Sequence, residues 1–538
     1  MLMRALSPRA WAYLLISAAL QILIFPLAGP LRTWCAALSW IALAPLFAAL
    51  LLPSRSGHAL QLREAAFAGY LCGIVWYLGN CYWIYQTMYL YGGLPKPVAL
   101  GILLLFALYL SLYHGLFALL FALVQRRGSR LALIAAPFLW VAVELARARI
   151  TGFPWDLLGY SQVDNLLLTR LAPVGGVVAI SFVLAAVNSA LTPLLLSKPR
   201  KRLGLILGAA AIALALQLGS HATSFNPANT APTHTAVLMQ EDLLVGEAAR
   251  GTVLLSPEQE MSTFSQWSSN SLLPFKGAWQ RPTGPQRTDV IIWPEAPAHF
   301  QSDNPAFRTG IATLARNQRA AVIVGSLGVD AAPALPRGYS LYDSASLFTS
   351  DGTYQSRYDK IHLVPWGEYV PFKNFFSFAD KLTQGVGDMD RGSRRTVFRT
   401  GGSTYGVFIC YESIFGDEVR EFVENGAQVL VNISDDGWYG DTGAPWQHLN
   451  MARMRAIENH RWLLRSTNTG VTTAIDPYGR MAFQAPRHVR AAFSFPFAFL
   501  DGETFYTRHG DWFAWLCGLV GVVMLGISQS PPRANRLN

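Results

Sequence analysis

The sequence predicts two parts of different fold class: a polytopic α-helical membrane domain and a layered α/β domain outside the cytoplasm. Of the 538 residues, 52% are hydrophobic and only 14% are charged, whereas soluble domains average about 25% charged residues. The deficit is uneven, because residues 222–508 have an ordinary globular composition and the rest is apolar. Within 222–508, short β-rich apolar runs alternate with helical stretches, which is typical of a layered α/β domain.

The apolar part contains runs long enough to cross a bilayer as helices, which takes about 20 residues. We predict eight membrane spans, near residues 11–28, 34–52, 66–90, 98–124, 131–147, 174–196, 203–219 and 511–528. The first run is preceded by two arginines, as in a signal peptide. No small-residue cleavage site follows it and another apolar run begins at once, so we interpret it as a helix.

The distribution of Lys and Arg predicts the orientation of these spans. Eight spans place both termini on one side, and the segments on that side hold most of the basic residues that flank the spans, including Arg126, Arg127, Lys198, Arg200 and Lys201. By the positive-inside rule the termini are cytoplasmic and residues 222–508 are external. We therefore expect a membrane domain at 1–221 with seven spans, an external domain at 222–508, and the eighth span with a cytoplasmic tail at 509–538.

The net charge of +10 does not indicate nucleic-acid binding. The basic residues cluster at the ends of apolar runs, a pattern that reports topology rather than a phosphate-binding face. We predict the membrane as a partner and no nucleic acid. The positions of Cys and His match no zinc-site spacing, and we expect neither a metal nor a cofactor.

Cys410 is the only thiol of the external part, since the other four cysteines lie in apolar segments, at Cys35, Cys72, Cys81 and Cys517. Outside the cytoplasm thiols normally pair as disulfides. A lone cysteine there is either sealed in a core or kept free for chemistry. Its position alone favours a buried thiol in the core. The residues around it, described below, favour a role in chemistry.

The external domain contains at least five predicted strands and three predicted helices. The strands lie in residues 288–293, 320–327, 344–360 (a hairpin around Ser-Asp-Gly), 403–410 and 427–434. Helical spacing is found at 304–319, at 416–426, where Gly426 is placed as a C-cap, and at 448–466.

Three of these β-segments are followed by reactive side chains, at Glu295, Lys360 and Cys410. Each alone has an ordinary explanation, as a loop carboxylate, a solvated lysine or a buried thiol. Together they suit nucleophilic acyl transfer, in which a thiolate attacks, a carboxylate moves the proton and an ammonium stabilises the oxyanion. The ordinary pKa of a cysteine is near 8.5, and we expect Lys360 to lower it.

The motifs around these residues resemble the nitrilase superfamily and, more closely, the apolipoprotein N-acyltransferase family. They read "IIWPEAP", "YDKIHLVPWGEYVPF", "FICYESIFGD", "NISDDGWYG" and "PWQHLNMARMRAIENHRWLLRSTNTGVT", with "ITGFPWDLLGYSQ" at 150–162. The resemblance covers almost all of 222–508 and extends into the membrane part. It implies a nitrilase-like αββα sandwich between the seventh and eighth of eight transmembrane helices.

The resemblance also implies the reaction, a ping-pong acyl transfer that completes lipoprotein maturation. Cys410 would take the sn-1 acyl chain of a phospholipid, typically phosphatidylethanolamine, as a thioester. A diacylglyceryl apolipoprotein would accept that chain on its N-terminal amine. By position Glu295 is the general base, Lys360 the oxyanion-side lysine and Cys410 the nucleophile. The expected location is the bacterial inner membrane with the catalytic domain in the periplasm, and we expect a monomer.

Further residues receive roles by the same resemblance. Glu368 matches a second essential glutamate that would orient Lys360 or relay a proton. Tyr411 and Glu412 flank the nucleophile, and the Tyr411 N–H is an expected oxyanion donor. Trp438 and Tyr439 either line the acyl site or pack a turn. Phe375, Phe376 and Phe378 belong either to a mobile arm that dips into the lipid or to an ordinary surface helix.

The sequence departs from the family pattern at a few positions near these motifs. Well-known members have Asn at the positions of Asp343 and Asp435, and many have a Trp after the Gln that matches Gln240, where this chain has none. We therefore expect differences in substrate positioning and pH dependence rather than in the trio itself. His299, His362, His448 and His460 are not expected to be catalytic, since the mechanism needs no imidazole.

Two other functions fit parts of the sequence. A membrane-tethered amidase would use the same trio on a small amide, but it would need one anchor rather than eight spans. A transporter or sensor with an external binding domain would not need three reactive residues at strand ends. The trio together with the many spans therefore favours acyl transfer.

Overall fold

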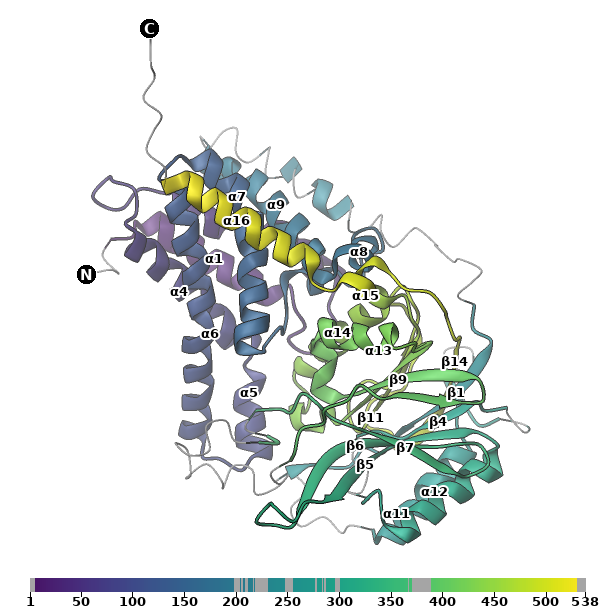
Figure 1. Cartoon of the computed structure of the whole chain (residues 1–538). Coiled ribbons are helices and arrows are strands. Elements are labelled where there is room, and N and C mark those ends of the chain that lie inside the picture. Colours follow the sequence, from purple (N-terminus) through teal and green to yellow (C-terminus); the bar gives the residue numbers. More distant parts are fainter. Residues whose placement is uncertain are drawn as a thin grey trace. The chain divides into compact units, whose positions relative to one another are not determined.

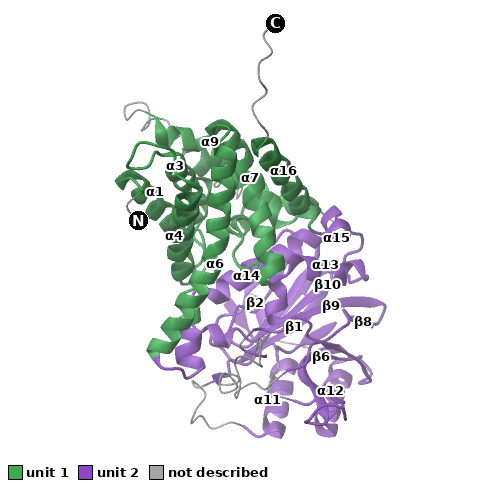
Figure 2. Cartoon of the chain, turned by 60° about the vertical axis from the view of Figure 1, so that its left-hand side comes forward, with its two compact units in different colours: residues 1–85, 96–224, 511–538 green, residues 86–95, 225–510 purple. Residues whose placement is uncertain are grey.

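A computed structural model describes residues 5–197, 204, 207–208, 211–215, 217, 231–246, 255–275, 278–282, 284, 287–295, 300–365, 367–369 and 389–529. The chain divides into two compact units (Figure 2). The helical unit comprises Met1–Tyr85, Lys96–Ser224 and Asp511–Asn538, and the α/β unit comprises Gln86–Pro95 and Phe225–Gly510. The short segment Gln86–Pro95 thus clusters with the α/β unit although the sequence places it beside a predicted span.

The helical unit is a bundle (Figure 1). Its helices are α1 (Pro8–Leu23), α2 (Thr33–Ala37), α3 (Ala44–Leu51), α4 (Leu62–Asn80), α5 (Trp83–Gln86, at the boundary of the units), α6 (Lys96–Gln125), α7 (Ser129–Ala146), α8 (Ala172–Gly175), α9 (Val177–Leu196) and α16 (Trp512–Gln529). Helices α4 and α6 pack closely, because a Cβ at Gly69 or Gly73 would lie 2.4 Å or 2.9 Å from atoms of His114. Small residues four apart allow such contacts between membrane helices.

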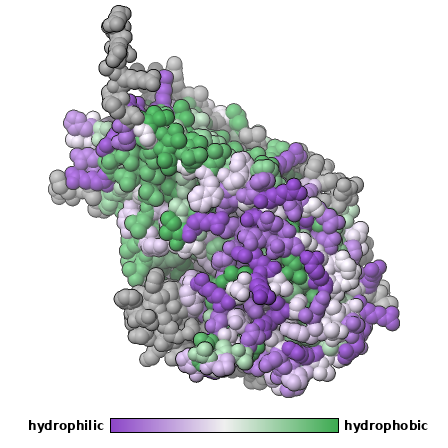
Figure 3. Space-filling view, viewed as in Figure 1, coloured by the Kyte–Doolittle hydropathy of each residue, from purple (hydrophilic) through white to green (hydrophobic). Residues whose placement is uncertain are grey.

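Within the described residues, five helical segments are long and apolar enough to cross a membrane: Thr33–Leu51, Lys96–Gln125, Ser129–Thr151, Val177–Leu196 and Trp512–Gln529. They correspond to five of the eight predicted spans. Large apolar side chains are exposed along two of these helices, as expected for surfaces that face lipid; they include Leu100, Leu105 and Leu112 on α6 and Trp515, Leu519 and Val522 on α16. Figure 3 shows apolar residues gathered over this unit.

The other three predicted spans stay predictions. Helix α1 has 16 residues, fewer than the roughly 20 that a span needs. The span predicted at 66–90 is not one continuous helix. Helix α4 ends at Asn80, and the chain continues as α5 and a π-helical turn, Thr87–Tyr91. The span predicted at 203–219 is described only in part, at residues 204, 207–208, 211–215 and 217.

The described part of the α/β unit contains two six-stranded sheets. The first has the order β14-β1-β4-β5-β6-β7, with β1 (His234–Gln240), β4 (Val290–Ile292), β5 (Ala321–Ala331), β6 (Tyr339–Phe348), β7 (Tyr354–Asp359) and β14 (Ala491–Phe497). The second has the order β13-β12-β11-β10-β9-β8, with β8 (Val397–Thr400), β9 (Ser403–Ile409), β10 (Val429–Ser434), β11 (Leu463–Thr467), β12 (Thr473–Ile475) and β13 (Met481–Gln484). Each has three parallel central strands, β1-β4-β5 and β9-β10-β11.

These sheets form an αββα sandwich, the nitrilase-like layering that the resemblance implies (Figure 1). One continuous core joins facing side chains of both sheets, for example Leu238 and Ile323 with Val407 and Val431. Helices α11 (Pro257–Ser269) and α12 (Pro305–Gln318) cover the first sheet, and α13 (Gly416–Glu424) and α14 (Ala444–Asn459) cover the second. The unit also contains a small hairpin, β2 (Leu273–Phe275) with β3 (Ala278–Gln280), and α15 (Phe505–His509).

The helix predicted at 448–466 is wrong in its extent. Helix α14 begins at Ala444, with Pro445 in its first turn, and ends at Asn459, because His460 adopts the left-handed conformation with φ 51°. Residues Leu463–Thr467 then form the buried strand β11. The helical spacing of apolar residues continued past His460 only by coincidence, since a short buried run does not distinguish a strand from a helix.

Candidate active site

The ends of three strands bring the predicted reactive residues together. Glu295 follows β4, Lys360 directly follows β7, and Cys410 directly follows β9. The two sheets face each other across one core, so the ends of β4 and β7 in one sheet meet the end of β9 in the other. All three side chains are buried, with exposed fractions of 8%, 0% and 7%.

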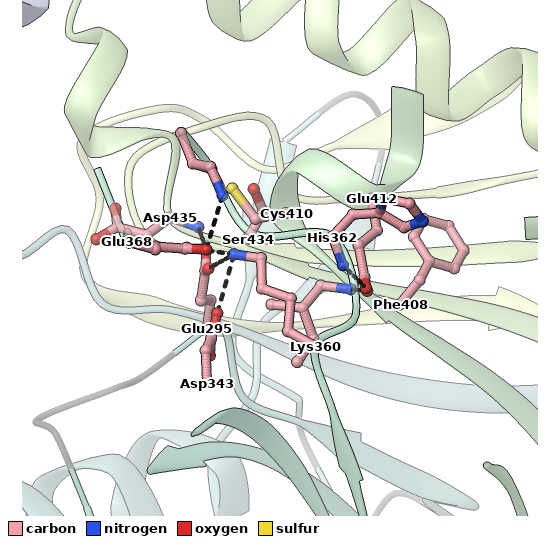
Figure 4. A network of polar contacts seen from close by, with 12 residues as sticks. Glu295, Asp343, Lys360, His362, Glu368, Phe408, Cys410, Glu412, Ser434 and Asp435 are labelled. Carbon is pink, nitrogen blue, oxygen red and sulfur yellow. Dashed lines mark hydrogen bonds and ion pairs between the residues drawn. The ribbon is translucent and has the colours of Figure 1, made fainter. Parts of the chain in front are cut away.

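Lys360 lies at the centre of this cluster (Figure 4). Its Nζ donates to Glu295 Oε1 at 2.8 Å, to Asp343 Oδ2 at 3.0 Å and to Glu368 Oε1 at 2.5 Å. The contact of Glu368 with Lys360 is compatible with both roles that the resemblance implies, orienting the lysine or relaying a proton, whereas the contact with Asp343 was not foreseen. Oxygens of the three carboxyls lie within 4.8 Å of one another, close enough to hold a metal ion. The ammonium group contacts all three, so the protein itself supplies a cation to this cluster.

The environment of Glu295 keeps it ionised. Its Oε2 accepts a hydrogen bond of 2.6 Å from the backbone N–H of Asp435, at the end of β10. Burial alone would raise the pKa of Glu295, but the Lys360 ammonium and the hydrogen bonds hold that pKa below its ordinary value. An ionised carboxylate in a buried site can accept a proton, which is the property a general base needs.

Cys410 sits in a turn with an unusual backbone. Its φ is 48°, in the left-handed region that costs a non-glycine residue roughly 1–3 kcal/mol and is common at functional sites. The residue opens a 3₁₀ turn, Cys410–Ile414. Figure 4 shows the sulfur beside the Glu295 carboxyl and the Lys360 ammonium, and both charges act on its pKa.

Lys360 lowers the pKa of the Cys410 thiol, as expected, but the net shift has the opposite direction. Burial raises that pKa well above its ordinary value, and the negative charge of Glu295 raises it further. Lys360 acts in the opposite direction, but three carboxyls surround its charge. The resting thiol is therefore neutral, and its proton has to leave as the sulfur attacks.

Glu412 ties two parts of the site together. Its Oε1 accepts from Tyr358 Oη at 2.8 Å and from the backbone N–H groups of Ile361 and His362 at 2.7 and 3.1 Å. Its Oε2 accepts from the Ile409 N–H at 2.7 Å. The chain after Lys360 and the chain before Cys410 are thus fixed to one carboxyl group, which is only 2% exposed. The predicted supporting position of Glu412 corresponds to this link.

A buried polar network lies beneath the cysteine turn, and the sequence reasoning missed it. His448 on α14 donates through Nε2 to the Cys410 carbonyl at 3.0 Å, and its Nδ1 lies 2.9 Å from Asp436 Oδ1. Arg465 on β11 donates to Asp436 Oδ2 at 2.7 Å and also bonds Asn432. His448 and Arg465 both lie in the segment predicted as one helix, 448–466, and its spacing does not reveal that these side chains are buried and paired.

The remaining predicted residues have mixed outcomes. Tyr411 is buried and packs edge-to-face on Phe415, with ring centroids 5.3 Å apart. Tyr439 is 8% exposed and lies near the Cys410 thiol. Trp438 is half-buried, and its carbonyl accepts from Thr87 Oγ1 at 2.9 Å. The predictions for Phe375, Phe376 and Phe378 fall outside the described residues.

Two family models and a solved structure match parts of this chain. Residues 11–190 match the model of the apolipoprotein N-acyltransferase N-terminal domain, and residues 254–491 match the carbon-nitrogen hydrolase model. A nitrilase-superfamily protein of Saccharomyces cerevisiae is 14% identical, with a TM-score of 0.36, over 53% of this chain and 96% of its own.

Two relatives match over most of their length, and both are named apolipoprotein N-acyltransferase. The protein of Geobacter metallireducens is 33% identical over 95% of this chain and 94% of its own. The protein of Methylococcus capsulatus is 34% identical over 85% of this chain and 87% of its own. The chain is therefore an acyltransferase enzyme and belongs to the apolipoprotein N-acyltransferase family.

Proposed function

We propose that the enzyme moves an acyl chain from the sn-1 position of a phospholipid, through a thioester on Cys410, to the N-terminal amine of a diacylglyceryl apolipoprotein. The observation that supports this most directly is the contact between Lys360 and an ionised Glu295 beside a buried thiol. Such a set can move a proton and stabilise an oxyanion in one place, which acyl transfer requires twice.

In the first half-reaction the Cys410 sulfur attacks the ester carbonyl carbon of the phospholipid. Glu295 takes the thiol proton as the C–S bond forms, and the carbonyl oxygen becomes an oxyanion. The Lys360 ammonium and the N–H of Tyr411 stabilise that oxyanion. When the tetrahedral intermediate collapses, the C–O bond breaks and the leaving alkoxide takes the proton from Glu295. The products are a lysophospholipid and the acylated enzyme.

In the second half-reaction the free α-amine of the lipoprotein attacks the thioester carbonyl. Glu295 takes a proton from the amine as the C–N bond forms, and the same donors stabilise the oxyanion. Collapse breaks the C–S bond, and the sulfur takes the proton back from Glu295. The amide product leaves, and the thiol, the carboxylate and the ammonium return to their starting states.

The raised pKa of Cys410 fits this cycle. A neutral thiol adds no fourth anion to the Lys360 ammonium. The three N–H donors of this group already reach carboxyl groups, so Lys360 stabilises the oxyanion through its positive charge. Glu368 holds Lys360 from a second side at 2.5 Å, and Glu412 fixes the two chain segments that present the lysine and the cysteine. These residues position the reacting groups, and we assign Trp438 and Tyr439 to the lining of the acyl site.

Both substrates have hydrocarbon chains in a bilayer, which explains why this catalytic unit belongs to a chain with apolar helices. The Lys and Arg distribution supports cytoplasmic termini. The α/β unit would then lie in the periplasm, anchored in the bacterial inner membrane, and we propose a monomer. Water has to be kept from the thioester, since hydrolysis competes with attack by the amine.

The test uses full-length protein with acyl-labelled phosphatidylethanolamine and a diacylglyceryl-cysteine peptide. Thin-layer chromatography should show lysophospholipid and labelled triacylated peptide with the wild type and with Cys35→Ala, which removes a thiol of the helical unit. Cys410→Ala should give neither product. Ammonia release from a small amide without lysophospholipid would instead identify an amidase.

A further inference from the structure

The charges around Lys360 do not balance. Three carboxyl groups contact one ammonium, and among the described residues no arginine, histidine or other lysine forms an ion pair with any of them. Exposed fractions of 5–9% leave little solvent to screen the repulsion. When carboxylates share a buried site, at least one keeps its proton. The question is which of the three holds it.

Backbone donors answer part of this question. Glu295 accepts the Asp435 N–H on Oε2 at 2.6 Å, and Glu368 accepts the Val364 N–H on Oε2 at 3.0 Å. Each of these two side chains therefore uses one oxygen for Lys360 and the other for a backbone donor. Hydrogen bonds from N–H groups stabilise the charged form of a carboxylate. They help to hold the pKa of Glu295 below its ordinary value, and at Glu368 the Val364 N–H opposes the rise in pKa that burial causes.

Asp343 has no such donor. Its Oδ2 accepts from Lys360 at 3.0 Å, and no donor among the described residues reaches its buried Oδ1. Its carboxyl also lies within hydrogen-bonding reach of the carboxyl of Glu295. Two carboxyl groups can bond to each other only if one carries a proton. Asp343 is the group at which a proton is held at the least cost.

We propose that Asp343 is a positioning residue of the acyl-transfer site that works as a neutral carboxylic acid, donating its proton to Glu295 while its second oxygen holds Lys360. This inference rests on the proposed role of Glu295 as the base. The hydrogen bond orients Glu295 and stabilises its charge, and the uncharged partner adds no further repulsion to the cluster. Asp343 thereby joins the end of β4 to the end of β7 from its own strand, β6.

The electrostatics of the site agree with this assignment. Burial raises the pKa of Asp343 well above its ordinary value. Of the charged groups that face it, Lys360 lowers that pKa, whereas Glu295 and Glu368 raise it. The pKa of Glu295 is lowered, in part by its hydrogen bond with Asp343. The pKa values of the two carboxyl groups are thus shifted in opposite directions. Asp343 is favoured as the neutral acid and Glu295 as the anion.

Infrared spectroscopy of the full-length protein at pH 9, well above the pKa of about 7 of Asp435, with and without carbon-labelled aspartate, tests this directly. The wild type should show the carbonyl band of a protonated aspartic acid, and Asp343→Asn should lack it. The matched control is Asp359→Asn, one residue before Lys360, because Asp359 pairs with Arg357 at 2.6 Å; it should leave the band unchanged. An absent band, or one that persists in Asp343→Asn, overturns the proposal.

Single-turnover acylation of Cys410 gives a second readout. Asp343→Leu removes the donor and should slow acylation roughly 10- to 100-fold, the effect of losing a hydrogen bond to a charged group. Asp343→Asn keeps a neutral donor and should restore most of that loss, whereas an equal loss in both variants would show that a charge is required and overturn the proposal. If the wild type forms no thioester at all, the proposed function fails, and the infrared result still decides the state of Asp343.

Discussion

At Lys360, a single buried ammonium stabilises a cluster that would otherwise repel itself. Its three carboxyl partners lie at 2.5–3.0 Å, and the side chain is fully buried. Buried ion pairs give little net stability, but removing one partner leaves an unpaired buried charge. The contacts that hold the lysine in the proposed active site therefore make it a structural residue as well.

Lys360→Met should destabilise the protein by about 3–5 kcal/mol at pH 8, since the carboxylates lose their cation. Without it their folded-state pKa values rise above the unfolded values, so stability returns as the pH falls and is lost as the pH rises. Thermal unfolding in detergent at pH 5 and pH 8 should show the gap to wild type narrowing at pH 5. Lys96→Met, at an exposed lysine, is the control, and a variant as stable as wild type at pH 8 would contradict the account.

Asp435 should give the site a pH dependence near neutrality. Burial raises the pKa of Asp435 to about 7, with a further contribution from the negative charge of Glu295. Above pH 7 the ionised group adds negative charge near the site and disfavours the Cys410 thiolate. Maleimide labelling of Cys410 should therefore be slower in wild type than in Asp435→Asn above pH 7, and the two should converge below it.

The pH dependence of stability, measured for the wild type and for Asp435→Asn, provides an independent check. The folded state holds the proton of Asp435 more tightly than the unfolded chain, whose aspartates titrate near 3.9. The contribution of this group to stability is present below that value and is lost as the pH rises through about 7. The Asn variant should lack this dependence, and parallel profiles in both assays would refute the role of Asp435.

At the scale of elements, the sequence predicted several strands well, because these strands are short runs of apolar and β-branched residues. Strands β4, β5, β9 and β10 lie within or close to their predicted ranges, so the positions of Glu295, Lys360 and Cys410 at strand ends are confirmed. Strands β1 and β14 were not predicted. Helix α14 was misplaced because β11 resembles its continuation, and contacts such as Asp343 with Lys360 depend on sheet pairing that one sequence does not reveal.

The turn that presents Cys410 should depend on helix α14 through His448. Replacing His448 by Ala removes the donor to the Cys410 carbonyl and leaves a cavity beside Asp436, so the acylation rate should fall at least about tenfold. His460→Ala, at the end of the same helix with a bond to Tyr478, should keep the rate within about twofold. Equal acylation rates for both variants would show that the turn keeps its conformation without His448.

At the scale of the whole molecule, the composition predicted two parts, and the structure has two compact units. The units divide the chain at one place that the composition did not indicate. The segment Gln86–Pro95 is counted with the α/β unit. Thr87 donates to the Trp438 carbonyl, and a Cβ at Gly440 would lie 2.3 Å from Tyr91 Oη. The chain between two helices of the bundle thus packs on the loop that follows β10, a tertiary contact with no local sequence signal.

Thr87→Val should weaken this contact while keeping the shape of the side chain. Losing one hydrogen bond should lower the free energy of unfolding of the α/β unit by about 1 kcal/mol. The rate of acyl transfer should also fall, because the loop that contains Trp438 is held less firmly. Thr309→Val, at an exposed threonine of α12, is the matched control for melting temperature and rate. Identical behaviour of the two variants would mean that the segment does not support the loop.

The central claim is that Cys410 carries the acyl chain between two substrates, and mass spectrometry of the intact protein tests it most directly. After one turnover with phospholipid and no acceptor, the peptide containing Cys410 should gain the mass of one acyl chain. Hydroxylamine should remove that mass, and Cys410→Ala should never acquire it. An enzyme that forms triacylated product while this peptide stays unmodified throughout the turnover would contradict the account.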